Sequence, residues 1–191
     1  LLGDAQDGAR IIAMPGAGTN VPIWLQGSSL FSAQLAAHLG LPYAFASHFA
    51  PRMLHQALAI YRQMFKPSAT LAKPYVIVGA PVIAAPTDAE AEYLATSTYQ
   101  RVLGILTGQR GLLPRPVEGF MEQLNYAERE AIEGFLAVAS IGGPERVQQR
   151  MLELAQSTGA DELMLVSDVF DGDLRLRSLE IAAHAMQPGH A

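Results

Sequence analysis

The sequence predicts an α/β fold built from parallel βα units. Short apolar runs and amphipathic helical patterns alternate at least four times along the chain. The run Leu163–Val166 is continuously apolar, as expected for a strand in a sheet that is covered on both faces. No short period repeats, which argues against a solenoid. Such an order favours parallel strands joined by right-handed crossovers.

Composition restricts the class of protein. The 191 residues suit one domain or part of a larger one, and half of them are apolar while 16% are charged, as in a globular protein. A net charge of −5 without a run of Lys or Arg argues against nucleic-acid and membrane-surface binding. The chain lacks cysteine, which excludes disulfides, zinc–thiolate sites and a cysteine nucleophile. Together with the lack of a long apolar run, this predicts a cytoplasmic protein.

The ends of the chain predict little structure. Residues 1–20 are rich in Gly, Ala and Asp and are expected to form an irregular lead-in. The chain starts with Leu1 in place of Met, so we expect that an upstream part was removed or never included. Residues 188–191 are predicted to be a disordered tail, which leaves 21–187 as the folded unit.

The first βα junction is the most informative stretch. A strand is predicted at Ile23–Leu25, followed by a turn at Gly27 and Ser28 and by a helix that begins near Leu30. One interpretation is that Ser28 or Ser29 caps this helix. The other is that free N–H groups of the helix N-terminus bind a phosphate, with Ser32 on the same side of the first turn. Gly27 would then allow a close backbone approach or a positive φ.

Further elements follow from the same rules. Strands are predicted at 42–47, 75–85 and 163–166, with Pro81 marking an edge, a bulge or a bend in the second of these. Helices are predicted from Pro51 to Pro67, from Thr87 to Thr107, from Ala127 to Val138, from Pro144 to Gly159 and from Leu174 to Met186. The segment 108–126 between them is an irregular insert, either a lid or a surface loop.

Three segments resemble a known family. They are Pro22–Ala37 (PIWLQGSSLFSAQLAA), Gly40–Pro51 (GLPYAFASHFAP) and Gly159–Met164 (GADELM). They are similar to the bacterial luciferase-like flavin monooxygenases, in particular to the luciferase family oxidoreductases. The resemblance implies a TIM (β/α)₈ barrel that binds reduced flavin mononucleotide, FMN, at the carboxyl ends of its strands. It covers the C-terminal half alone, which corresponds to strands 5 to 8.

The resemblance also implies a cofactor site. The family's phosphate-binding turn after the fifth strand matches Ser28, Ser29 and Ser32, next to Gly27. His48, at the end of the next strand, would face the mouth of the barrel, although a histidine there can also be an ordinary surface or core residue. The strands that carry the family's other flavin contacts and its catalytic histidine are absent. No catalytic residue can therefore be assigned.

The leading functional expectation is an FMN-dependent monooxygenase, or a C-terminal fragment of one. It would use reduced flavin and O₂ on a small organic substrate, with a flavin reductase as a further partner. One alternative is a flavin-binding or structural half-barrel without catalysis. Another is an oxidoreductase that uses the deazaflavin F420.

Half a barrel has open sheet edges, which parallel sheets rarely expose. We therefore expect a missing N-terminal half, a homo-oligomer in which two copies pair, or rearranged loops. No metal site is expected. The acidic residues Asp161, Glu162, Asp168, Asp171 and Asp173 have no histidine at ligand spacing, and Asp171 or Asp173 is predicted to cap a helix.

Overall fold

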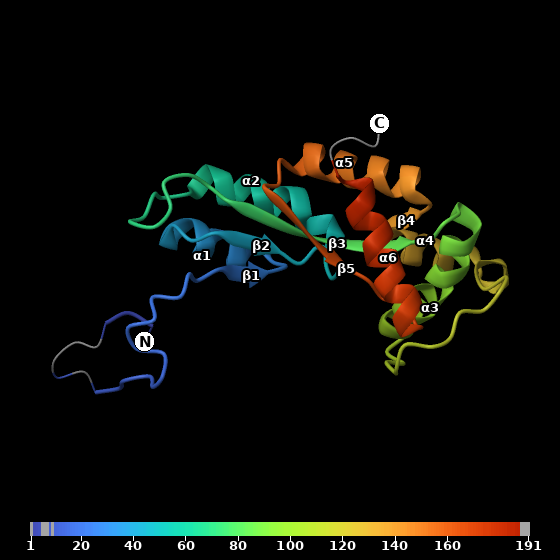
Figure 1. Ribbon diagram of the computed structural model, residues 1–191, viewed down its shortest axis with the longest axis horizontal. Coiled ribbons are helices and arrows are strands. Elements are labelled where there is room, and N and C mark those ends of the chain that lie inside the picture. Colours follow the sequence, from blue (N-terminus) through green and yellow to red (C-terminus); the bar gives the residue numbers. More distant parts are fainter. Residues whose placement is uncertain (1, 5–7, 9, 188–191) are drawn as a thin grey trace.

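In the part of the chain that the structure describes, five parallel strands form the centre, and helices lie beside and between them (Figure 1). The structure, a computed structural model, describes residues 2–4, 8 and 10–187. The strands are β1 (Leu25–Gly27), β2 (Tyr43–Phe45), β3 (Val76–Ala84), β4 (Ser140–Gly142) and β5 (Glu162–Val166). The predicted parallel α/β fold is confirmed.

The long strand β3 organises the sheet. Its first part pairs with β2 on one side, where Tyr43 lies opposite Val76, and β2 in turn pairs with β1. From Ile77 to Pro81 it also pairs with β5, and from Val82 to Ala84 it pairs with β4. Within the described residues, β1 pairs with β2 alone and β5 with β3 alone, so each leaves one side of its backbone unpaired.

Pro81 marks the change of partner in β3. It is the last residue of β3 in register with β5, opposite Val166, and pairing with β4 begins at the next residue. Proline has no N–H to donate to a neighbouring strand, so a change of partner at this residue is physically reasonable. The interruption predicted at Pro81 is thus a switch between strands. The short strand β4 itself was not predicted.

In the described residues, six α-helices lie between and after the strands. They are α1 (Leu30–Leu39), α2 (Leu54–Met64), α3 (Asp88–Leu106), α4 (Tyr126–Phe135), α5 (Pro144–Thr158) and α6 (Gly172–Ala185). A 3₁₀ turn at Pro51–Met53 precedes α2, and another, η2, lies at Met121–Gln123. Gly40 and Gly159 follow α1 and α5 in the left-handed conformation, with φ of 62° and 57°. These two helix ends confirm the predictions from the sequence.

The first strand differs from its prediction. It lies at Leu25–Gly27, two residues later than expected, because its ladder with β2 begins only at Leu25, opposite Tyr43. Ile23 and Trp24 precede the ladder and are 55% and 40% exposed. Apolar character alone therefore placed the strand too early, and Gly27 is its last residue.

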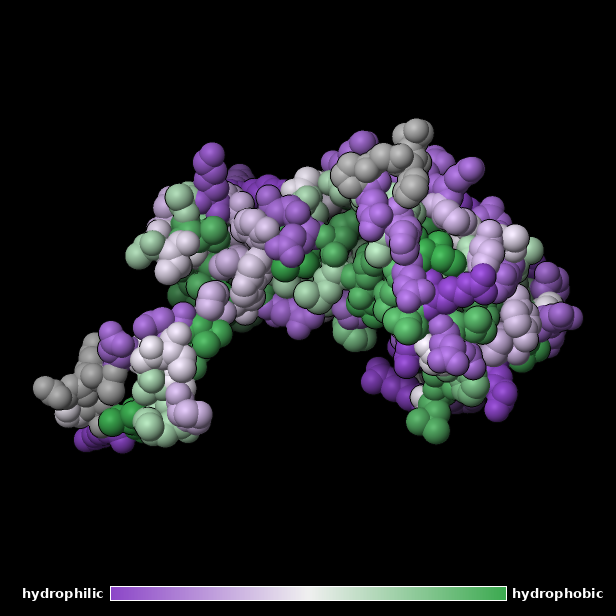
Figure 2. Space-filling view, viewed as in Figure 1, coloured by the Kyte–Doolittle hydropathy of each residue, from purple (hydrophilic) through white to green (hydrophobic). Residues whose placement is uncertain are grey.

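One face of the sheet packs under helices. Val76, Val78 and Ala80 of β3 belong to a core cluster with residues of α1 and α2. Because side chains alternate along a strand, Ile77 and Gly79 face the opposite side. On β5, Met164 is 56% exposed and no residue is buried, so the expectation that this strand is covered on both faces was wrong. Figure 2 shows apolar surface along the middle of the molecule, where β5 and α6 lie in Figure 1.

The remaining segments are irregular. The described residues of the predicted lead-in 1–20 form turns and bends without a helix or strand. The insert 108–126 contains η2 but is attached to α3, since the N–H of Val117 donates to Thr96 Oγ1 at 2.9 Å and Gln100 Nε2 donates to the Arg115 carbonyl at 2.9 Å. The predicted tail 188–191 lies outside the described residues. Across the described helices, none is long and apolar enough to cross a membrane.

Candidate functional site

The carboxyl ends of the parallel strands meet at one edge of the sheet. Ser28 follows β1, Ser47 and His48 come shortly after β2, and Ser167 and Asp168 follow β5. In parallel α/β folds this edge is where ligands bind. The predicted site residues therefore lie at the edge that the fold class favours.

The turn after β1 is a capped helix start. Ser29 is the N-cap of α1, and its Oγ accepts from the N–H of Ser32 at 3.2 Å. In return, the N–H of Ser29 points at Ser32 Oγ, 3.3 Å away. The N-cap interpretation is thus confirmed for Ser29. Ser29 is nevertheless exposed, and its hydroxyl donates to Ser32 Oγ only in a long contact of 3.3 Å, which a bound anion could replace.

Ser32 points inward. It is buried, and its Oγ lies 2.9 Å from the hydroxyl oxygen of Tyr43. The side chain fills the space beside Gly27, where an added Cβ would overlap both Ser32 Oγ and Ser32 Cβ. Gly27 does not have a positive φ, so that part of the expectation was wrong. Glycine is needed here because Ser32 occupies the place of a side chain.

The electrostatics of the turn favour an anion. The first turn of α1 contains no acidic residue, and the unpaired N–H groups of a helix N-terminus carry partial positive charge. Ser28 is half-buried and Ser29 is exposed, so both are at or near the surface of this edge. The arrangement can present hydroxyl and backbone donors to one negatively charged group.

His48 lies on the sheet next to the turn. Its ring centroid is 4.2 Å from that of Phe49, and a Cβ on Gly79 would be only 2.8 Å from His48 Nδ1. Since Gly79 faces away from the helix-covered side, the imidazole lies on the opposite face of β3. Burial lowers the pKa of His48, while Asp168 raises it and Arg101 lowers it further. The lowered pKa favours the neutral form of the imidazole.

Sequence reasoning missed an ion pair beside His48. Arg101 of α3 pairs with Asp168, and Thr98 Oγ1, one turn earlier on the same helix, donates to the Asp168 carbonyl at 3.2 Å. The spacing of Thr98 and Arg101 puts them on one helix face, but the sequence does not indicate which segment that face meets. The buried Nδ1 of His48, Oγ of Ser167 and Nε of Arg101 have no hydrogen-bond partner among the described residues.

The other acidic residues have structural partners. Asp161 Oδ2 accepts from the N–H of Val76 at 2.8 Å, and Glu162 Oε1 accepts from the hydroxyl of Tyr75 at 2.6 Å. Asp171 Oδ1 accepts from the N–H groups of Asp173 and Leu174, both at 3.0 Å, as the N-cap of α6. The predicted helix cap is confirmed at Asp171. Within the described part of the chain, no three His, Asp or Glu side chains gather as metal ligands do.

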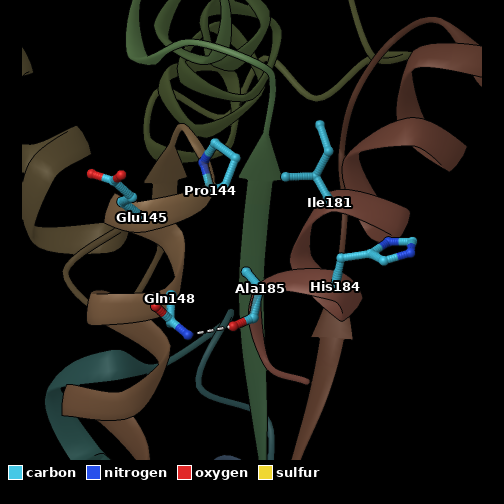
Figure 3. A pocket seen from close by; sticks show the side chains of 6 residues that line it. All are labelled: Pro144, Glu145, Gln148, Ile181, His184 and Ala185. Atoms are coloured by element: carbon cyan, nitrogen blue, oxygen red, sulfur yellow. Dashed lines mark hydrogen bonds between the residues drawn. The ribbon is translucent and has the colours of Figure 1, made fainter. Parts of the chain in front are cut away.

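A cavity of about 270 Å³ lies between α5 and α6 (Figure 3). Its lining residues are Pro144, Glu145, Gln148, Ile181, His184 and Ala185. Figure 3 shows Gln148 reaching across it, where Nε2 donates to the Ala185 carbonyl at 2.6 Å. None of the predicted cofactor residues lines this cavity, so it is separate from the candidate site.

Comparison with known proteins decides the family. Residues 3–162 match the sequence model of the luciferase-like monooxygenase family. A curated protein of Escherichia coli K12, named luciferase-like monooxygenase, is 43% identical over 180 residues. This chain belongs to the luciferase-like monooxygenase family. The resemblance found in the sequence is thereby confirmed.

This chain spans about half the length of the curated relatives it matches. The alignment with the Escherichia coli protein covers 94% of this chain and 54% of the relative. The uncharacterized protein YvbT of Bacillus subtilis is 44% identical over 174 residues, which cover 91% of this chain and 52% of that one.

Solved structures agree with the fold. Apo-MsnO8 is similar with a TM-score of 0.73 and 31% identity, over 93% of this chain and 54% of that one. An FMN complex of the oxygenating constituent of 3,6-diketocamphane monooxygenase from Pseudomonas putida has a TM-score of 0.61 at 21% identity, over 92% of this chain and 51% of that one. An F420-dependent secondary alcohol dehydrogenase has a TM-score of 0.57 at 12% identity, over 90% of this chain and 51% of that one. The last two share the luciferase-like fold alone.

Proposed function

We propose that this chain is the C-terminal, flavin-binding half of an FMN-dependent monooxygenase. In this proposal β1, β2, β3 and β5 are strands 5 to 8 of a (β/α)₈ barrel. Three findings support it. The strands are parallel and adjacent in that order, the outer strands β1 and β5 each have one side without a partner among the described residues, and the chain matches about half of its relatives' length. The missing four strands would close the barrel between β5 and β1.

The observation that carries the cofactor proposal is the exposed Ser28–Ser29 turn at the carboxyl end of β1. The flavin phosphate would accept hydrogen bonds there from the two hydroxyls and from the N–H groups of Leu30 and Phe31, which have no acceptor within α1 by helix geometry. The residues present fit such a group, because they are donors and the first turn of α1 contains no acidic residue. Ser32 supports the turn from inside.

Reduced flavin, when bound, would supply the electrons that activate O₂. His48 would place a neutral imidazole beside the bound ring system. This group would donate or accept a hydrogen bond without adding charge. The insert 108–126 would help to exclude water from the mouth, held in place by its bonds to Thr96 and Gln100.

The partners in this proposal are a small organic substrate, O₂ and a flavin reductase. The chain itself would require its N-terminal half or a second copy to cover the unpaired strand sides. Light scattering after size exclusion tests the second copy directly. A monomeric mass at micromolar concentration would leave the N-terminal half as the only proposed complement.

FMN titration by fluorescence quenching tests the cofactor site. Ser29→Ala should weaken FMN binding by about 1.5 to 3 kcal/mol, because a hydrogen bond to a charged group is lost. Ser29→Asp is the sharper variant, since Asp is as good an N-cap as Ser but repels a phosphate. It should abolish FMN binding and leave the binding of riboflavin, which lacks the phosphate, unchanged. Unchanged FMN affinity in both variants would remove Ser29 from the site.

The same experiments distinguish the proposed function from its two alternatives. The fold shared with an F420-dependent dehydrogenase supports F420 as the second candidate cofactor. Tighter binding of F420 than of FMN would favour that enzyme class. Binding of FMN without consumption of reduced flavin and O₂, in the presence of a reductase, would favour a flavin-binding half-barrel without catalysis.

A further inference from the structure

The β1 side of the molecule belongs to a long stretch of sequence without charge. Residues 11–51 contain no Lys, Arg, Asp or Glu. Residues 21–39, which comprise β1, α1 and the segment before β1, are called the β1 flank here. Its exposed large apolar side chains are Val21, Ile23, Trp24, Phe31, Leu35 and Leu39. Single exposed apolar residues are ordinary, but an apolar patch depleted in charge is typical of an interaction surface.

The apolar residues of α1 form a ridge that another helix can meet. Phe31, Leu35 and Leu39 are four residues apart and are 70%, 37% and 49% exposed. Residues at this spacing make one ridge along a helix, which packs into the groove of a neighbouring helix. Next to this ridge, β1 has one side of its backbone without a partner among the described residues. The β1 flank therefore fits a strand and a helix together, which is a βα unit.

The opposite edge of the sheet, formed by β5 and α6, is such a βα unit. Leu163–Val166 is continuously apolar, yet no residue of β5 is buried. A groove of about 350 Å³ lies beside the strand, lined by Leu163, Leu165 and residues of α5 and α6. On α6, Leu176 is 59% exposed. Figure 2 shows apolar surface over these elements, so this edge, like the β1 flank, exposes apolar side chains.

The two edges have matching geometry. Val78 packs in a core cluster with α1, and Val82 packs in a cluster with α6. These residues are four apart on β3, so α1 and α6 cover the same face of the sheet. All strands are parallel. In consequence, β1 of one molecule can lie beside β5 of another, with α1 next to α6.

The charged residues near the two edges also complement each other. The exposed Lys66 lies at the end of α1, with Nζ 3.2 Å from His38 Nδ1. The exposed Asp161 and Glu162 lie at the start of β5. Both groups are at the amino ends of the strands, since α1 ends shortly before β2 begins. Opposite charges around an apolar contact help to fix its register.

We infer that two copies of this chain join edge to edge and close one barrel of eight parallel strands, with β1 of each copy beside β5 of the other. The inference rests on the proposed function, which assigns β1, β2, β3 and β5 to half a barrel. A second copy fits because each chain carries both edges of the contact and half of the strands required. A two-fold axis forms the contact twice and leaves no edge open.

The pairing would complete the candidate site. The Ser28–Ser29 turn follows β1, so in the dimer it would lie beside the carboxyl end of β5 from the other copy. The mouth of the barrel would then be enclosed by both copies. Each dimer would contain two such turns.

Light scattering after size exclusion, across micromolar concentrations, tests the pairing. The unmodified chain should have twice the mass of one chain. Leu35→Glu places a charge in the ridge of α1 and should weaken the dimer about a hundredfold, because an unpaired charge is buried. Leu112→Glu is the matched control, since Leu112 is 97% exposed in the insert, and it should leave the mass unchanged. Circular dichroism checks folding, and Leu39→Glu takes the place of Leu35→Glu if that variant does not fold.

A substitution on α6 tests which surface meets the β1 flank. Leu35 and Leu176 each lie in the second turn of a helix that begins at the carboxyl edge of the sheet. Leu176→Lys should therefore weaken the dimer as Leu35→Glu does. A chain with both substitutions places opposite charges across each contact and should recover about tenfold in affinity over either single variant. A dimer in which two β1 flanks meet would show neither effect.

The outcomes decide the inference one by one. A monomeric mass at every concentration would overturn it and leave an N-terminal half as the cover of both edges. A dimer that survives Leu35→Glu or Leu176→Lys would also overturn it, and so would assemblies larger than a dimer, because the two-fold ring would not close. The FMN titration tests the proposed function separately. If the dimer responds at both edges but binds FMN no better than riboflavin, the cofactor proposal fails and the pairing stands.

Discussion

Arg101 of α3 and Asp168, the second residue after β5, form an ion pair at the carboxyl edge of the sheet. Their side chains are 29% and 34% exposed, so water screens the pair only in part. Thr98 binds the backbone of the same segment. The pair therefore attaches the long helix after β3 to the end of the neighbouring strand, close to His48.

Replacing Arg101 should destabilise this connection. We expect Arg101→Met to lower the free energy of unfolding by about 1 kcal/mol, since a partly buried pair contributes more than a fully exposed one. Urea denaturation measures the change. Arg110→Met, at an exposed position in the insert, is the control and should stay within about 0.5 kcal/mol of the unmodified chain. Equal effects of the two substitutions would mean that the ion pair contributes nothing.

Gly27 cannot carry a side chain without moving Ser32. Gly27→Ala should destabilise the chain by about 1 to 3 kcal/mol, because the added Cβ overlaps Ser32 and the turn must shift. It should also weaken FMN binding in the titration. Gly111→Ala is the matched control, since nothing lies within 4 Å of its added Cβ, and it should be close to neutral in both measurements. A stable Gly27→Ala variant with full FMN affinity would contradict this account of the turn.

Gly79 provides the space that His48 occupies on the sheet. In Gly79→Ala the added Cβ would be 2.8 Å from His48 Nδ1, so the ring should move toward solvent. The pKa of His48 should then rise toward its ordinary value of 6.5, because burial is the main cause of its lowering. NMR titration of the imidazole checks this. An unchanged His48 titration in the variant would show that the ring does not depend on Gly79.

Lowering the pH should destabilise the fold, in part because His48 becomes protonated. The folded-state pKa is lowered from 6.5, so the unfolded chain binds the proton more readily. The contribution of the neutral ring is fully present above pH 6.5 and is lost as the pH falls below it, through the folded-state pKa. Denaturation midpoints between pH 7.5 and pH 5 should therefore fall less in His48→Gln than in the unmodified chain. His55→Gln, at an exposed position of α2, should retain the full pH dependence.

Much of the fold could be read from local patterns. The glycines after α1 and α5, the cap at Asp171 and the existence of strand β5 all depend on short-range chemistry, and these predictions were confirmed. The expected burial of β5 on both faces was wrong, because no residue of this strand is buried. The start of β1 was misplaced, because pairing with β2 and not apolarity defines where that strand begins. The short strand β4 escaped prediction, since its three residues become a strand only against the end of β3.

For the candidate site, the sequence determined the residue types and their order: a strand, a glycine, two serines and a helix start, in a chain of the luciferase-like family. Only the tertiary structure decided which hydroxyl faces outward, why Gly27 must be glycine, and that Arg101 meets Asp168. The physical reason is that capping and apolar periodicity act within a few residues. The partner of a buried hydroxyl or charge, in contrast, lies on another element, and packing alone selects it.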